Sequence, residues 1–178
     1  YMPIDAHIPF CDGWYIFYVL WYPLLGGVGL YLAFREPEGF KRYMTYIGVS
    51  FFTALLLFAL IPNGQDLRPD LAALGRENLF TRLIGVLYAS DTNTNVCPSL
   101  HVVGSLAAVF AVLHSDRLRR TRWVPILVGL LACLISVSTV MIKQHSLLDV
   151  VVGVPYALIV YRFIYWSCGR NITPKSTP

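Results

Sequence analysis

Residues that could carry out chemistry are concentrated in short polar segments of an otherwise apolar chain. His145 and Asp149 stand four positions apart, so a helix would place them on one face. There the carboxylate can fix the tautomer of the imidazole, which leaves the second ring nitrogen as a base or a nucleophile. Ser146 and Asp149 also match a capping box, in which the carboxylate would only satisfy the start of the helix. The pattern leaves both roles open for Asp149.

A second segment, residues 97–101, joins a polar turn to an apolar run. Pro98 and Ser99 favour the start of a helix, so the first backbone N–H groups of that helix would point outward. Such a helix end suits a phosphate group. We therefore expect this segment, with His101, to face the same site as the first. The alternative is that Ser99 only caps the helix and His101 only fills polar space near the interface.

Two further histidines and two arginines are predicted to lie outside this group. His114 follows His101 by 13 positions on the same predicted helix, a separation of roughly 20 Å at about 1.5 Å per residue. His7 is expected to be a surface residue near the N-terminus. Arg76 and Arg82 are expected to face solvent or lipid headgroups rather than a catalytic centre.

The elements that must position these residues are transmembrane helices. Hydrophobic residues form 56% of the 178 and charged residues 13%, with a mean hydropathy of +0.59, which is too apolar for a soluble domain. A span needs about 20 apolar residues. We predict an all-α, polytopic transmembrane helical bundle forming a single membrane-embedded domain over 1–178, with an interfacial helix from Leu71 to Tyr88. Its five spans are predicted at about 14–34, 43–62, 97–116, 123–142 and 147–167.

Positive charge sets the expected orientation. Ten of the 14 lysines and arginines fall on one side of a five-span arrangement, and the positive-inside rule makes that side cytoplasmic. The ten are Arg35, Lys41, Arg42, Arg117, Arg119, Arg120, Arg122, Arg162, Arg170 and Lys175. We therefore predict a multi-pass protein of the cell membrane whose polar site faces the extracytoplasmic side. The basic residues are not interleaved with aromatic ones, so no nucleic-acid partner is expected.

Three motifs in order resemble the type 2 phosphatidic acid phosphatase superfamily. These lipid phosphate phosphatases share a helical fold with vanadium-dependent haloperoxidases. The motifs are Arg68-Pro69, then Pro98-Ser99-Leu100-His101, then His145 with Asp149, and the likeness covers the chain from about Tyr43 to Val160. Because this family commonly has six spans, we also expect a further transmembrane helix upstream of Tyr1.

The resemblance implies a role for each residue of the motifs. His145 would attack phosphorus and form a phosphohistidine, Asp149 would orient it, and His101 would protonate the leaving alcohol. The phosphoryl oxygens would be held by Arg68, by the Ser99 hydroxyl and by backbone N–H groups near Leu100. The scheme implies no metal and no other cofactor.

The sequence departs from the family pattern at two cationic positions. The family has a lysine seven residues before the arginine and an arginine six residues before the nucleophile, where this chain has Ile61 and Thr139. The usual glycine between serine and histidine is Leu100. A bound phosphate needs cationic partners, so we predict that Lys143, two residues before His145, is an additional phosphate ligand. The alternative for a lone lysine at a helix end is snorkelling to the interface.

The function predicted from the sequence is hydrolysis of a lipid phosphate or pyrophosphate monoester at an extracytoplasmic site. The expected partners are a membrane lipid phosphate as substrate and the bilayer, with no obligatory protein partner. One alternative is a lipid phosphotransferase of the inositol phosphorylceramide synthase type. A less favoured alternative is a transporter that relays protons through His145, Asp149 and Lys143. The sequence leaves open which lipid is used, the oligomeric state, and whether Cys11 and Cys97 pair.

Overall fold

The computed structural model describes residues 1–166, and within that range it is helical with no strand beyond one isolated bridge between Gly64 and Thr94. The α-helices are α1 Tyr15–Val19, α2 Trp21–Arg35, α3 Pro37–Leu60, α4 Leu79–Ser90, α5 Leu100–His114, α6 Trp123–Met141 and α7 Leu147–Tyr161. Shorter helical segments are η1 Pro3–His7, η2 Asp12–Trp14, η3 Ala72–Leu74, η4 Leu118–Arg120 and η5 Arg162–Trp166. The predicted all-α class is confirmed.

Four helical stretches are long and apolar enough to cross a membrane: Asp12–Arg35, Pro37–Leu60, Trp123–Met141 and Leu147–Trp166. These correspond to four of the five predicted spans. The predicted span at 97–116 is the shorter helix α5, whose 15 residues cover about 22 Å at 1.5 Å per residue. That length falls short of a hydrocarbon core of about 30 Å, so five spans is an approximate count.

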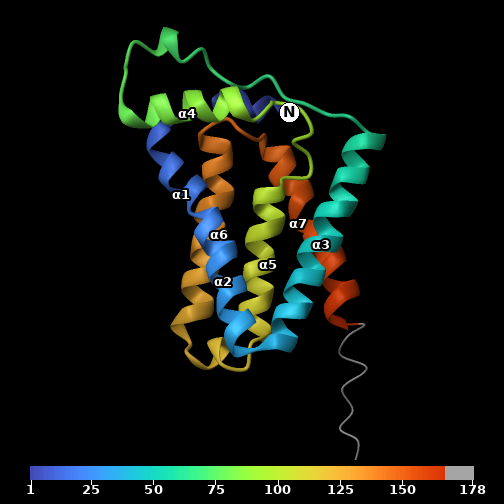
Figure 1. Cartoon of the computed structure of the whole chain (residues 1–178). Helices are drawn as coiled ribbons and strands as arrows, with labels where there is room; N and C mark the ends of the chain where they lie inside the picture. Colours follow the sequence, from blue (N-terminus) through green and yellow to red (C-terminus); the bar gives the residue numbers. More distant parts are fainter. Residues whose placement is uncertain (167–178) are drawn as a thin grey trace, which may run out of the picture.

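Helix α5 is short but central. It packs against α2, α3, α6 and α7, and Figure 1 shows it in the middle of the bundle. Val103, Ala107 and Ala108 on this helix are completely buried. Small side chains let neighbouring helices approach closely in a membrane. Because other helices rather than lipid cover most of its surface, α5 is the natural place for a buried histidine.

Helices α2 and α5 approach each other closely at Gly104 of α5. A Cβ atom at this position would lie 2.8 Å from Nε1 of Trp21. The Trp21 ring stacks against Phe51 of α3, with ring centroids 6.4 Å apart. Gly104 therefore lets an aromatic side chain of α2 lie directly against α5.

The predicted interfacial helix from Leu71 to Tyr88 is wrong in its first half. The chain forms only the short η3 segment and then turns at Gly75, whose φ is 63°. That left-handed conformation is readily available to glycine and ends the helical segment. Asn78 then caps α4 by accepting from the backbone N–H of Thr81, so the helix begins at Leu79.

Helix α4 lies across one end of the bundle, at the same end as the N-terminus and the turn between α6 and α7 (Figure 1). The α2–α3 turn and the α5–α6 connection lie at the opposite end (Figure 1). There the Glu36 carboxylate accepts from the Ser115 hydroxyl at 2.6 Å and from the backbone N–H of Arg117 at 3.2 Å. The predicted grouping of these two loops is confirmed. Arg170 and Lys175 lie outside the described residues.

Replacing Gly104 with alanine should destabilise the bundle, because the new methyl group would displace the Trp21 ring. Overpacking of this kind typically costs about 1 to 3 kcal/mol. Gly129→Ala in α6 is the matched control, since a Cβ there meets nothing within 4 Å. Thermal unfolding in detergent should show a lower midpoint for Gly104→Ala and an equal or higher one for Gly129→Ala. Equal midpoints for the two variants would contradict the close approach of α2 to α5.

Candidate active site

The candidate site is built around the turn of residues 142–146, which joins α6 to α7. The backbone N–H groups of Gln144 and His145 both donate to the carbonyl oxygen of Thr139, at 2.9 and 3.0 Å. Lys143 adopts a positive φ of 55°, so the turn reverses sharply after α6. This arrangement places His145 immediately before the first turn of α7.

His145 and Asp149 are in contact, as their spacing predicted. Nδ1 of His145 lies 3.3 Å from Oδ2 of Asp149. The same Oδ2 accepts from the backbone N–H of Ser146 at 2.8 Å, and the Asp149 N–H donates to the Ser146 hydroxyl at 3.4 Å. The carboxylate therefore does both things that the sequence left open: it completes the capping box and it contacts the imidazole.

His101 faces His145 from the neighbouring helix. The two ring centroids are 5.8 Å apart, and the ring planes are inclined at 63°. The His101 ring is packed between Tyr18 and Trp21, at centroid distances of 4.3 and 4.6 Å. Its Nε2 atom is buried and has no hydrogen-bond partner. A buried polar atom without a partner is uncommon in a folded protein, and a bound substrate would supply one.

The two histidines line a pocket of about 120 Å³. A water molecule occupies about 30 Å³ in the liquid, so this volume corresponds to about four waters. That is enough for a phosphoryl group but not for a lipid tail. The rest of the lining is Asp91, Thr92, Thr94, Asn95, Val96, Leu100 and Gln144. Since Asp91, Thr92, Thr94 and Asn95 are exposed, the pocket reaches the surface at the α4 end of the bundle.

Ser99 is the N-cap residue of α5 and is completely buried. Its hydroxyl has no hydrogen-bond partner, and its backbone N–H donates to the Asp149 carbonyl at 3.2 Å. The structure thus brings the start of α5 against the first turn of α7. Leu100 lines the pocket directly, whereas Ser99 is not among its lining residues.

Arg68 reaches the site through Gln144. Its guanidinium donates to Oε1 of Gln144 at 3.0 Å and to the Tyr88 carbonyl at 3.1 Å, and it lies over the Tyr88 ring. The Gln144 amide in turn donates to Oδ2 of Asp91 at 2.6 Å. Sequence reasoning did not single out Gln144 or Asp91. For Gln144 the available signal was its position next to His145.

Lys143 is not brought to the pocket. Its ammonium is buried and donates to the backbone carbonyl of Asp5 at 2.7 Å. Burial lowers the pKa of the Lys143 ammonium, and the nearby Asp5 carboxylate opposes that shift. Its role as a phosphate ligand stays a prediction, and it would require the ammonium to leave Asp5.

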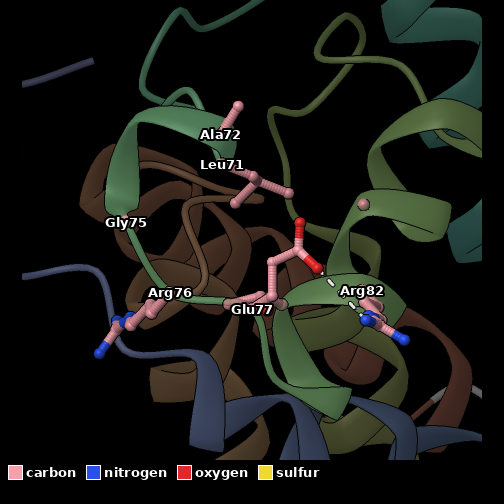
Figure 2. A pocket seen from close by; sticks show the side chains of 8 residues that line it. Leu71, Ala72, Gly75, Arg76, Glu77 and Arg82 are labelled. Atoms are coloured by element: carbon pink, nitrogen blue, oxygen red, sulfur yellow. Dashed lines mark hydrogen bonds and ion pairs between the residues drawn. The ribbon is translucent and has the colours of Figure 1, made fainter.

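A larger pocket of about 570 Å³ lies under the loop of residues 71–77, against α4. Figure 2 shows the Glu77 carboxylate pointing into it and bonded to Arg82, at 3.2 Å. Arg76 points away from it and lies 3.7 Å from the Asp12 carboxylate. Both arginines have acidic partners and neither His101 nor His145 lines this pocket, so the smaller pocket is the better candidate site.

The remaining histidines lie outside the site. His7 is exposed, and His114 ends α5 at the opposite end of the bundle, where its Nδ1 lies 2.9 Å from the Phe110 carbonyl. Cys11 and Cys97 are both free thiols. Among residues 1–166, no group of three or more His, Cys, Asp or Glu side chains is placed to hold a metal ion.

Comparison with known protein families matches the chain to the model of the PAP2 superfamily over residues 42–173. The match includes all three motifs that line or adjoin the small pocket. Searches of curated proteins and of solved structures find no match. Because the family model covers well over half of the chain and contains the paired histidines of the site, the chain belongs to the PAP2 superfamily.

Proposed function

We propose that the protein hydrolyses a lipid phosphate or pyrophosphate monoester through a phosphohistidine formed on His145. Membership of the PAP2 superfamily indicates phosphatase-type activity on phosphate esters. The observation that carries the finer proposal is the pairing of His145 with Asp149 at 3.3 Å while His101 faces the same small pocket. One histidine is thereby oriented by a carboxylate, and the second is free to exchange a proton.

Two proton-balanced steps follow from this geometry. With Nδ1 directed at Asp149, Nε2 of His145 forms a bond to phosphorus as the bond from phosphorus to the ester oxygen breaks. His101 gives its proton to that oxygen, which leaves as the alcohol. His101 then takes a proton from water as the water oxygen attacks phosphorus, and the N–P bond breaks to release inorganic phosphate. No acceptor other than water is required.

The phosphoryl oxygens would be held by groups around the start of α5 and by Arg68. The Ser99 hydroxyl and His101 Nε2 are buried without partners, so they favour a site that is completed by a ligand. Backbone N–H groups at the first turn of α5 add positive electrostatic potential. Arg68 contacts Gln144 in the pocket wall, so its guanidinium is the cation that the proposal assigns to the phosphate. Positioning and charge stabilisation of this kind are what phosphoryl transfer needs.

A lipid is the proposed source of the phosphate because of where the pocket lies. It sits at the end of a bundle with four helices long and apolar enough to cross a membrane, where a headgroup phosphate would meet it. The small pocket accepts the phosphate while the tail stays outside, in the bilayer. The same end lacks the dense positive charge of the opposite loops, so we place the site on the extracytoplasmic face of the cell membrane.

His145→Ala should lower phosphate release from lipid phosphates by on the order of a thousandfold or more, as removal of a covalent catalyst commonly does. The measurement is a phosphate-release assay over purified lipid phosphates in detergent, with EDTA present throughout. EDTA should leave the parent rate unchanged. His7→Ala is the control, since this histidine is exposed and should keep parental activity. Activity of His145→Ala within tenfold of the parent would contradict the assignment of His145 as the nucleophile.

Asp149→Asn separates the two roles of the carboxylate. The amide oxygen can still accept from the Ser146 N–H, but the negative charge that orients His145 is lost, so turnover should fall by roughly a hundredfold or more. Ser146→Ala removes the other half of the capping box and should cost about 1 kcal/mol of stability with a much smaller loss of turnover. Both rates and unfolding midpoints should be measured. Equal losses of turnover in the two variants would reduce Asp149 to a helix cap.

Labelling of single cysteines tests the proposed orientation. Glu38 is exposed at the start of α3 and Asp66 is exposed in the loop after its end, so they lie at opposite ends of this long helix. Each can be changed to cysteine in a background without the four native thiols. In intact cells an impermeant thiol reagent should modify Asp66→Cys and leave Glu38→Cys unmodified until the membrane is opened. The reverse pattern would place the site on the cytoplasmic face.

A further inference from the structure

The N-terminal segment η1, Pro3–His7, lies against the turn that carries His145. Its Asp5 is completely buried, and a carboxylate is rarely buried without partners. Oδ1 of Asp5 accepts from the backbone N–H of Leu147 at 2.8 Å, and Oδ2 accepts from the backbone N–H of Met2 at 2.7 Å. The Asp5 carboxylate thus joins the N-terminal segment to the first residue of α7.

Two further contacts connect the same regions. The Lys143 ammonium donates to the Asp5 carbonyl at 2.7 Å, and the backbone N–H of Cys11 donates to the Met141 carbonyl at 3.0 Å. Together with the Asp5 carboxylate, these contacts reach the end of α6, the turn itself and the start of α7. Residues 5–11 of the N-terminal region therefore hold the turn on both sides of His145.

Leu147 matters because it is the first residue of α7. An N–H group at this position has no partner within its own helix, and Asp5 supplies one. The neighbouring Ser146 and Asp149 belong to the same first turn, and Oδ2 of Asp149 contacts the His145 imidazole. Any displacement of this turn therefore changes the position of the imidazole, and a misplacement of about 1 Å can cost roughly a hundredfold in rate.

We propose that Asp5 is a positioning residue: by binding the Leu147 N–H it fixes the first turn of α7 and, through it, the His145–Asp149 pair. The proposal rests on the proposed function, in which His145 is the nucleophile. The proposal adds Asp5 to the residues that support the site, although Asp5 lies 140 positions before His145 in the sequence and outside all three motifs of the PAP2 superfamily. It also gives Lys143 a second role, as part of the same clamp.

Variants of Asp5 test the proposal, with Asp12 as the matched control. Asp12 is the other nearly buried carboxylate of the N-terminal region, but it binds Asn78 and Arg76 beside α4. Asp5→Ala should lower kcat by about ten- to a hundredfold and leave KM within about twofold, the pattern of a misplaced catalytic group. Asp5→Asn retains an acceptor for the Leu147 N–H and should recover most of the rate. Asp12→Ala should keep the parental kcat even where its stability falls.

Leu147→Pro removes the same hydrogen bond from the other side. Proline is well tolerated at the first position of a helix, and Ser146 already has the extended conformation, φ −83° and ψ 163°, that a following proline requires. This variant should lose a similar factor in kcat. Because both changes remove one interaction, the double variant Asp5→Ala/Leu147→Pro should be no slower than the slower single variant. If Asp5→Ala folds poorly, a near-parental kcat for Asp5→Asn together with a reduced kcat for Leu147→Pro still tests the hydrogen bond.

Amide hydrogen exchange over residues 142–149 of the detergent-solubilised chain completes the test without relying on activity. Asp5→Ala and Leu147→Pro should speed exchange there, and Asp12→Ala should not. A kcat for Asp5→Ala equal to that of Asp12→Ala, additive losses in the double variant, or unchanged exchange would each overturn the proposal. A parent protein that releases no phosphate from any lipid would instead overturn the proposed function, and the exchange data would still decide whether Asp5 holds the turn.

Discussion

The candidate site depends on the hydrogen bonding of the turn between α6 and α7. This turn ends one helix and starts another, so it contains carbonyl and N–H groups that no helix satisfies. Its residues from Ile142 to Ser146 are buried, and an unpaired buried backbone group is costly. The turn can keep its shape only if side chains from elsewhere bind these groups.

Side chains from separate segments of the chain do so. The Tyr88 hydroxyl donates to the Ile142 carbonyl, and the Gln65 amide donates to the carbonyls of Lys143 and Gln144. These residues come from α4 and from the loop after α3. Together with the N-terminal segment, they surround the turn with specific partners. The polar connection between α3 and α5 therefore does more than join helices, because its side chains bind the backbone of the turn.

The second requirement is a close approach of α5 to its neighbours. Gly104 admits Trp21, and the Trp21 ring lies against His101. The rings of Tyr18 and Trp21 pack against His101 and fix its orientation, but its Nε2 has no hydrogen-bond partner. The imidazole is thus held by packing and kept free for a ligand. The small residue Gly104 thus acts on the candidate site through Trp21, which contacts His101.

The sequence was sufficient for the helical class, for the contact of His145 with Asp149 and for the placing of His101 beside His145. The first two follow from apolar runs and helical spacing, and the third from the order of the spans and the resemblance to the family. It was insufficient where contacts join distant segments. The pairing of Arg68 with Gln144 and the burial of Asp5 depend on tertiary packing, which leaves no local pattern. Gly75 and Asn78 did carry a local signal for the start of α4, but the apolar periodicity from Leu71 onward masked it.

The central claim is that phosphorus becomes bonded to His145 during turnover. The most direct measurement is rapid alkaline quenching of the protein during hydrolysis of a lipid phosphate labelled with radioactive phosphorus, followed by peptide mapping. The account predicts a label that is stable in alkali and lost in acid, located on the peptide that contains His145. It also predicts that the label accumulates when a His101 variant acts on a substrate whose leaving group needs no proton. In that case the attack of water on the phosphohistidine is slowed more than phosphoryl transfer to His145. Full turnover with no labelled peptide, or a label on another residue, would contradict the account.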